Sequence, residues 1–253
     1  HCGVFYLLVA LAAVPLIKKV HQYINIPEKI TQETCFQLKC FCDNHRIAQN
    51  GKPGILIQQF YWLRHYIDGA LFRIGRLEYR LRDWPGEVKV YRNISTKKTI
   101  ALIADGTRLN LEGFVAFDDD QKAISATLIE SKQLVRGFPV SPRGFVILKE
   151  TALQRKEWQK GLTKGHLFLD MHIPAGGGMT LERCFQSMVQ SFDFFKTYFP
   201  EQHPVAIGCI SWIFNTQLET ALPNSNMANL MKELYLFPVV SSGKDGIFFV
   251  FCK

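Results

Sequence analysis

Three consecutive glycines, at positions 176–178, separate a strand-like segment from the start of a helix. The stretch reads HLFLDMHIPAGGGMTLERCFQSM from His166. Glycine loses more conformational freedom on folding than other residues, so a triplet indicates either a tight connection or a loop that approaches a ligand closely. Thr180 is a suitable N-cap, and free backbone N–H groups before a helix bind anions such as phosphate. The pattern therefore predicts a phosphate-binding loop or a plain connection, and position alone does not separate the two.

The strand-like segment before the glycines carries two residues that could move protons. Side chains alternate between the faces of a strand, so Asp170 and His172 share one face while Leu169 and Met171 share the other. At this spacing each of the two polar residues influences the ionisation of its neighbour. His172 could then act as a general base that Asp170 orients, although a histidine hydrogen-bonded within the core is the simpler alternative.

A second strand-like run, residues 205–212, places Cys209 and Ser211 on one face. A strand, a helix and a second strand in this order form a right-handed crossover with two parallel strands. His172 could therefore come near either Cys209 or Ser211, which allows an alternative reaction with a covalent acyl intermediate on one of them.

The composition indicates a globular protein with an anionic partner. The chain has 253 residues, 47% hydrophobic and 21% charged, which excludes a disordered protein. The net charge of +8 suits a phosphate-bearing ligand, nucleic acid or a membrane surface. No recognition motif accompanies the charge, so we expect no nucleic-acid partner. Seven cysteines at irregular spacings do not resemble a secreted disulfide framework, and they favour a reducing, cytoplasmic location.

One cluster of residues could hold a metal ion. It consists of Cys35, Cys40, Cys42 and His45. The spacing fits none of the usual zinc patterns, and we expect all four side chains on one helix as half-buried groups. We therefore predict no metal site.

The N-terminal residues 4–17 are apolar. This run is too short to span a bilayer as a helix, and no basic region precedes it as in a signal peptide. We expect a buried helix and no membrane partner. The chain begins without Met and stops inside the apolar run GIFFVFCK, which indicates a piece of a longer protein.

The spacing of apolar residues changes near residue 70. Residues 3–70 have helical spacing, whereas from residue 71 the period is two, as in strands. The first strand has a charged face that we expect to lie in water: Arg76, Glu78, Arg80 and Arg82. The later helix over 180–199 should bury Cys184, Phe185, Met188, Phe192, Phe195 and Phe199. The other expected elements are a hairpin at Asp105-Gly106, a short helix near 152–162, a strand over 166–173, a strand over 205–212, a helix over 215–222 and a terminal pair of strands within 236–252.

Five stretches carry a resemblance to a known family. They read INIPEKITQETCFQL, WLRHYIDGALFRIGRLEY, GFPVSPRG, HIPAGGGMTLERCFQSMVQSFDFFKTYFP and CISWIFNTQLETALPNSN, and they are spread over nearly the whole chain. The sequence resembles bacterial acyltransferase-domain proteins that join an N-terminal acyltransferase-like domain to a GNAT-like C-terminal domain. The resemblance implies an α+β fold with a mixed, mostly antiparallel central sheet and a splayed parallel strand pair. Residues 1–70 would be a helical region, residues 71–253 the GNAT-like domain, and an upstream domain would be missing.

The resemblance also implies a function. The domain would transfer an acyl group from acyl-CoA or acetyl-CoA to an amine, with no metal cofactor, and the alternative is a non-catalytic module that binds CoA or a partner domain. The pantetheine arm would lie between the splayed strands, and the pyrophosphate would bind backbone amides of the glycine loop. By this resemblance the loop residues that bind CoA are Ala175, Gly176, Gly177, Gly178, Met179 and Thr180.

Two positions depart from the family pattern. The usual GNAT loop reads Gln/Arg-x-x-Gly-x-Gly/Ala, and its first position falls on Ile173 here. Many relatives have a histidine in the C-x-S-W segment, where this chain has Ile210. Tyr235 lies where GNAT acids often occur, although a core or surface tyrosine is the simpler interpretation.

Overall fold

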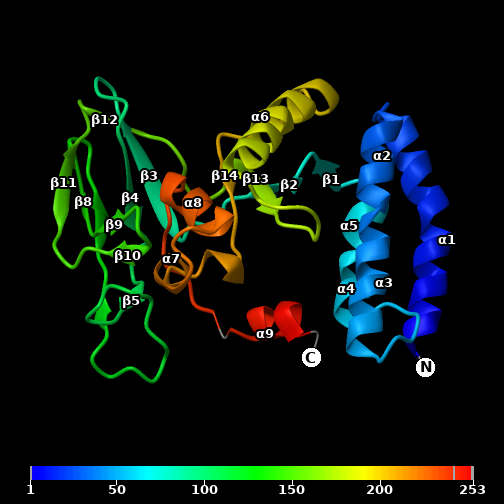
Figure 1. The fold of residues 1–253 in the computed structure, drawn as a ribbon. Helices are drawn as coiled ribbons and strands as arrows, with labels where there is room; N and C mark the ends of the chain where they lie inside the picture. Colours follow the sequence, from blue (N-terminus) through cyan, green and yellow to red (C-terminus); the bar gives the residue numbers. More distant parts are fainter. Residues whose placement is uncertain (1, 242, 252–253) are drawn as a thin grey trace.

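A computed structural model describes residues 2–241 and 243–251. A bundle of N-terminal helices lies at one end of the molecule, and a group of β-sheets lies at the other, with the glycine-loop strand and helix between them (Figure 1). The N-terminal helices are α1 (Cys2–Tyr23), α2 (Glu28–Cys35), α3 (Gln37–Ala48), α4 (Ile57–Trp62) and α5 (Arg64–Ile67).

The helical bundle has its own apolar core. Ala10, Ala13 and Ile17 of α1 pack against Leu38 and Leu63, which come from the segments of α3 and α4–α5. Small alanines at the contact allow the helices to approach closely. This core continues into the first strand, so the bundle is packed against the sheet.

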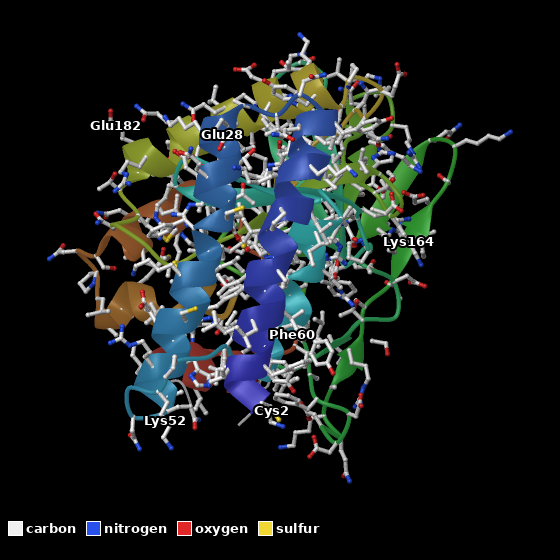
Figure 2. All side chains as sticks on the ribbon, turned by 90° about the vertical axis from the view of Figure 1, so that its right-hand side faces the viewer. Cys2, Glu28, Lys52, Phe60, Lys164 and Glu182 are labelled. Atoms are coloured by element: carbon white, nitrogen blue, oxygen red, sulfur yellow. The ribbon has the colours of Figure 1, made fainter. Side chains whose placement is uncertain are left out.

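The outer face of α1 differs from the expected buried helix. Phe5, Leu8 and Leu11 are more than half exposed, and Figure 2 views the molecule from the side on which α1 lies. At 22 residues α1 is also longer than expected, and by length and composition it could cross a membrane. Core helices of soluble proteins and signal sequences share this length and apolar composition.

A four-stranded sheet positions the glycine loop. Its strands are β1 (Leu71–Ile74), β2 (Leu77–Asp83), β13 (Leu167–His172) and β14 (Ile207–Gly208), in that order. The first two pairings are antiparallel, and β13 pairs with β14 in parallel. Helix α6 (Leu181–Tyr198) packs one face of this sheet through Phe194 and Phe195, which contact Phe72 of β1. The predicted mixed sheet with a parallel strand pair after a helical region is therefore confirmed.

The chain between β2 and β13 forms smaller antiparallel sheets. A five-stranded sheet has the order β10-β9-β4-β3-β12, a three-stranded sheet has the order β11-β8-β7, and β5 pairs with β6. These strands are β3 (Val88–Asn93), β4 (Thr99–Ile103), β5 (Arg108–Leu109), β6 (Ile124–Ser125), β7 (Leu128–Glu130), β8 (Leu134–Gly137), β9 (Pro139–Ser141), β10 (Phe145–Val146), β11 (Thr151–Gln154) and β12 (Trp158–Lys160). After β14 follow the 3-10 helix η1 (Trp212–Phe214), α7 (Gln217–Ala221), α8 (Asn226–Glu233) and α9 (Lys244–Phe251).

Several expected elements are wrong because long-range pairing overrides local pattern. The segment 152–162 contains β11 and β12 instead of a helix, since β11 pairs with β8 and β12 with β3. Asp105-Gly106 does form a turn, with a φ of 75° at Gly106, but β4 and β5 do not pair with each other. Within 236–251 the described residues form α9 and no strand pair, and residues 242, 252 and 253 lie outside the described part.

The helices also differ in detail from the prediction. The cysteine cluster lies on two helices, because α2 ends at Cys35 and α3 begins at Gln37. In α6, Cys184 and Phe195 are buried as expected, whereas Phe185 and Phe192 are 41% and 40% exposed. The helix therefore buries a narrower stripe than its phenylalanines suggest.

Candidate functional site

The parallel strands β13 and β14 stay paired over two positions only. Leu169 opposes Ile207 and Asp170 opposes Gly208, after which β13 continues to His172 while the other segment turns toward η1. A cavity of about 1170 Å³ opens where the two segments part. Its walls include residues 172–176 on one side and residues 210–213 on the other. The splayed arrangement that the resemblance implied therefore contains a cleft.

Three arginines hold the glycine loop by its carbonyl oxygens. Arg76 Nη1 donates to Pro174 O at 2.9 Å, and Arg73 Nη1 donates to Ala175 O at 3.3 Å. The third contact runs from Arg183 Nη1 to the carbonyl of the last glycine at 3.5 Å. Because carbonyl groups face the guanidinium groups, the loop is braced without using its N–H groups.

The N–H groups of the loop remain available. Among the described residues, none accepts a hydrogen bond from the backbone N–H groups of residues 175–179. Gly176 has a φ of 139°, which residues with a side chain rarely adopt. The Thr180 hydroxyl accepts a hydrogen bond from Arg183 N at 3.4 Å, which confirms the predicted N-cap. Free amides, a helix N-terminus and nearby arginines together suit a phosphate group.

His172 and Asp170 are brought together as the sequence suggested. The His172 Nε2 atom lies 3.1 Å from Asp170 Oδ2. The same oxygen accepts from Arg80 Nε at 2.9 Å and from Arg82 Nη1 at 3.1 Å. Burial raises the pKa of Asp170, but the hydrogen bonds and charges of His172 and Arg80 outweigh it and lower the pKa to about 2. Asp170 is therefore a carboxylate at neutral pH, and it only accepts hydrogen bonds.

Aromatic and cationic groups pack around this pair. The Trp62 ring meets His172 edge-on at a centroid distance of 4.9 Å, and Arg80 lies 5.1 Å from the centre of the same ring. On its other side Arg80 Nη1 donates to His65 Nε2 at 3.0 Å. Burial and the charge of Arg80 lower the pKa of His65 to about 4, so His65 is neutral at pH 7. These contacts fix the orientation of His172 from the side of the helical bundle.

Glu78 is a further candidate for the site, although the strand pattern predicted that it lies in water. It lies on β2 directly opposite His172, it is 2% exposed, and it lines the same cavity. The Tyr66 hydroxyl lies 3.2 Å from both of its carboxylate oxygens. Burial raises the pKa of Glu78 to about 7, against the lowering effect of nearby Arg73 and of the Tyr66 hydrogen bond. The expectation of a solvated charged face is wrong here because the helical bundle covers β2, which the strand's own alternation does not reveal.

The structure does not bring His172 together with Cys209 or Ser211 in a hydrogen bond between described residues. Ser211 Oγ instead accepts from Ile213 N at 3.4 Å and caps η1. Burial raises the pKa of the Cys209 thiol well above its ordinary value, which disfavours the reactive thiolate. Among the residues that the structure describes, neither is hydrogen-bonded to the base that a covalent mechanism requires.

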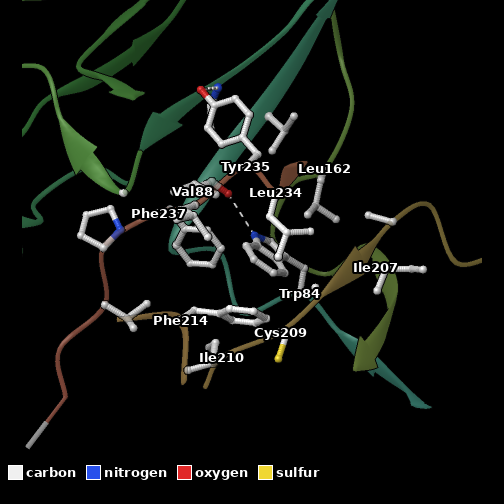
Figure 3. Close-up of a pocket in the computed structure, with 18 of the residues that line it drawn as sticks. Trp84, Val88, Leu162, Ile207, Cys209, Ile210, Phe214, Leu234, Tyr235 and Phe237 are labelled. Atoms are coloured by element: carbon white, nitrogen blue, oxygen red, sulfur yellow. Dashed lines mark hydrogen bonds between the residues drawn. The ribbon is translucent and has the colours of Figure 1, made fainter. Parts of the chain in front are cut away.

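Figure 3 shows a second cavity, whose volume is about 800 Å³. The two share Ile210, Ser211 and Val239. Most of the second cavity's lining is apolar, as the side chains in Figure 3 show: Trp84, Val88, Leu162, Phe214, Leu234 and Phe237.

Tyr235 lines this second cavity, but its hydroxyl is hydrogen-bonded to the backbone. Its hydroxyl donates to Val140 O at 2.6 Å and accepts from Ala101 N at 3.1 Å. These contacts favour the core interpretation of Tyr235 over a catalytic acid. In the described part of the chain, no group of three His, Cys, Asp or Glu residues could hold a metal ion.

Comparisons with known proteins agree with the fold. A family model described as a GNAT-like C-terminal domain matches residues 71–253. No curated protein matches the chain.

Solved structures of acyltransferases share the fold. An acyltransferase in complex with decanoyl-CoA and teicoplanin is 20% identical, with a TM-score of 0.59 over 97% of this chain and 53% of that one. An acyltransferase in complex with decanoyl-CoA is 21% identical, with a TM-score of 0.59 over 98% of this chain and 54% of that one. An acyltransferase mutant in complex with octanoyl-CoA is 19% identical, with a TM-score of 0.60 over 98% of this chain and 55% of that one. The chain thus spans about half the length of these relatives.

Proposed function

The chain belongs to the family of GNAT-like C-terminal domains, and from this premise we propose that it binds an acyl-CoA and transfers the acyl group to an amine. The observation that carries the proposal is the cavity between the end of β13 and residues 210–213. It is bordered by a glycine loop whose N–H groups find no acceptor among the described residues. The acyltransferase relatives, which are complexes with CoA or acyl-CoA, support the choice of ligand.

In this proposal the glycine loop binds the pyrophosphate of CoA. The backbone N–H groups of residues 175–179 donate to the phosphate oxygens, and Arg73 and Arg183 contribute positive charge from either side of the loop. Glycine is required because a side chain here would occupy the space of the phosphate. A β-carbon at Gly177 would already lie 3.2 Å from Arg183 Nη1.

The adjoining apolar cavity is suited to the acyl chain. It shares Ile210 and Ser211 with the lining of the first cavity, and in this proposal the thioester lies near these residues. Each methylene group removed from water contributes about 0.8 kcal/mol, so an apolar space of this size favours long chains over acetyl.

His172 acts as the general base. Since the Asp170 carboxylate can only accept, His172 Nε2 carries a hydrogen and Nδ1 is left to receive a proton. The amine nitrogen attacks the thioester carbonyl carbon, the C–N bond forms and the C–S bond breaks. The proton lost by the amine goes to His172, and the CoA thiolate leaves and takes up a proton. Removing a general base of this kind lowers rates about 10²–10⁴-fold.

Calorimetry with CoA and with pantetheine, which lacks the diphosphate, tests the proposal. We expect the wild-type chain to bind CoA at least tenfold more tightly than pantetheine. Gly177→Val should abolish this preference. Arg46→Gln changes a charge on the exposed surface and serves as the control, which should keep the preference. Both variants should melt at the wild-type temperature. Equal affinity of the wild-type chain for the two ligands, or no CoA binding at millimolar concentration, would contradict the proposal.

A further inference from the structure

Helix α6 carries an apolar stripe on the side that faces away from the sheet. Ser187 marks the side toward the sheet, because it is buried and its hydroxyl accepts from Leu77 N at 3.2 Å. Phe185, Val189 and Phe192 are 41%, 64% and 40% exposed. At about 3.6 residues per turn, these three side chains share one narrow arc opposite Ser187. The helix lies along the outer edge of the molecule in both ribbon views (Figure 1 and Figure 2).

The arrangement of the three residues distinguishes this stripe from ordinary surface exposure. Single exposed apolar side chains are common on folded proteins and need no partner. Val189 follows Phe185 by four residues and precedes Phe192 by three, which is the spacing with which a helix packs against another helix. Contiguous apolar surface of this kind is typical of protein–protein contacts.

The stripe has a charge of opposite sign at each end. Glu182 lies in the first turn of α6 and Lys196 in the last, and both are exposed. Within the described part of the chain, neither side chain forms an ion pair. Their signs suit the helix dipole, but the dipole does not require them to lie on the same side of the helix as the apolar residues.

A stripe of this pattern is complementary to a reversed copy of itself. Glu182 and Lys196 are each seven residues from Val189, and Phe185 and Phe192 are four and three residues from it. A two-fold axis at Val189 therefore brings the negative end of one stripe to the positive end of the other. Interfaces between identical chains related by a two-fold axis require this self-complementarity. A parallel pair would place like charges together.

We propose that two copies of this chain form a homodimer in which their α6 helices pack antiparallel across a two-fold axis at Val189. Phe185 of each copy packs against the partner's Phe192, and Glu182 pairs with the partner's Lys196. Since α6 has 18 residues, the two glycine loops lie at opposite ends of the helix pair, roughly 27 Å apart along its axis. This inference does not depend on the proposed acyl transfer.

The other charges on α6 do not oppose this pairing. They are those of Arg183 and Asp193, so the helix carries two positive and two negative side chains. The net charge of +8 repels two copies at long range, and physiological salt screens that repulsion beyond about 8 Å. A single helix pair buries less than the roughly 800 Å² per partner of a standard interface. We therefore expect a weak dimer, with a Kd of about 10–100 µM.

Sedimentation velocity of the full chain tests the dimer, at about 5–500 µM protein so that the range spans the expected Kd. We expect the wild type to change from monomer to dimer across this range. Val189→Asp should stay monomeric at every concentration. Leu11→Asp makes the same kind of change on the exposed face of α1 and should dimerise like the wild type. A wild-type chain that stays monomeric, a dimer that survives Val189→Asp, or one that Leu11→Asp abolishes would overturn the proposal.

A charge exchange tests the two-fold arrangement itself. Glu182→Lys alone, or Lys196→Glu alone, places like charges together twice in each dimer and should weaken it about tenfold. Both changes in one chain restore opposite charges, so the double variant should recover the wild-type Kd. Thermal melting followed by circular dichroism checks that each variant is folded. Single variants with the wild-type Kd, or a double variant as weak as the single ones, would rule out the antiparallel pairing.

Discussion

The two cavities that share Ile210 and Ser211 differ in the kinds of side chain that line them. The smaller one is lined by Trp84, Phe214 and other apolar side chains, and its one tyrosine is fully bonded to the backbone. The larger one is lined by the buried Glu78 and by Gln37 and Gln59, whose buried amide oxygens have no hydrogen-bond partner among the described residues.

This difference separates stabilising residues from those retained for chemistry. Burying apolar side chains stabilises the folded state, so the residues that line the smaller cavity stabilise the protein whether or not a ligand is bound. Buried unpaired polar atoms oppose folding, and such exceptions to the usual rules concentrate at functional sites. If the larger cavity carries out the chemistry and the smaller one only binds the acyl chain, substitutions in the two cavities should have different effects.

The largest expected effect is on turnover. His172→Ala should lower kcat with an acyl-CoA and an amine by about 10²–10⁴-fold, because the amine loses its proton acceptor. Steady-state kinetics and calorimetry should show nearly unchanged CoA affinity. His166→Ala is the control, since His166 is bonded to Gly161 O and does not line the cavity, and it should keep full activity. Similar kcat values for the two variants would remove His172 from the mechanism.

The next effect is on stability and concerns the apolar cavity. Trp84 is 3% exposed and its Nε1 donates to Val88 O at 2.9 Å. Trp84→Ala should lower the free energy of unfolding by about 3–5 kcal/mol. Gln37→Leu, beside the larger cavity, should leave it unchanged or raise it by about 1 kcal/mol. Chemical denaturation measures both variants. Equal losses in the free energy of unfolding would contradict the difference between the cavities.

A pH-dependent effect follows from Glu78. Its folded pKa of about 7 lies above the ordinary 4.5, so the folded protein binds a proton more tightly than the unfolded chain. The contribution of Glu78 to the free energy of unfolding is therefore fully present below about pH 4.5, and it is lost as the pH rises to about 7. The loss amounts to about 3 kcal/mol at 1.36 kcal/mol per pKa unit.

Glu78→Gln isolates this contribution because the amide does not titrate. We expect the unfolding free energy of the variant, relative to the wild type, to increase between pH 4.5 and pH 7. Denaturation curves at several pH values give the difference directly. A difference that stays constant across this range would show that Glu78 is not buried as a neutral acid.

A smaller effect concerns the acyl chain. Ala206 lines the apolar cavity, and Ala206→Leu would fill part of that space. We expect the ratio of kcat/KM for decanoyl-CoA over acetyl-CoA to fall about tenfold, equivalent to about 1.4 kcal/mol of chain burial. Acetyl-CoA itself should react at nearly the wild-type rate. If the ratio does not change, the acyl chain lies elsewhere.

The smallest expected effect is that of Cys209→Ala. Within the described part of the chain the thiol is hydrogen-bonded to no base, and burial raises its pKa, so we expect kcat to change by less than about twofold. Loss of turnover, or an acylated cysteine trapped and found by mass spectrometry, would favour the covalent mechanism instead.

The local features of the site could be predicted from the sequence. The alternation in residues 166–173 correctly places Asp170 and His172 on one face, and Thr180 caps the helix as expected. The resemblance to GNAT-like C-terminal domains is confirmed for residues 71–253. The strand face and the helix cap were predicted correctly because a strand period and an N-cap depend on neighbouring residues alone.

Features that depend on distant partners could not be predicted. The short strands of residues 151–160 have no strong period of their own and are set by pairing with β8 and β3. Phe185 and Phe192 have helical spacing typical of a core face, yet both are exposed, because burial depends on which face of α6 the sheet covers.

The sequence by itself determined a strand, a glycine loop and a capped helix, with a histidine and an aspartate side by side. The tertiary structure alone decided that Glu78 and the amides of Gln37 and Gln59 are buried around one cavity. The physical reason is that burial and its effect on ionisation depend on which surfaces cover a residue. For Glu78 the cover is the helical bundle, which no pattern within β2 encodes.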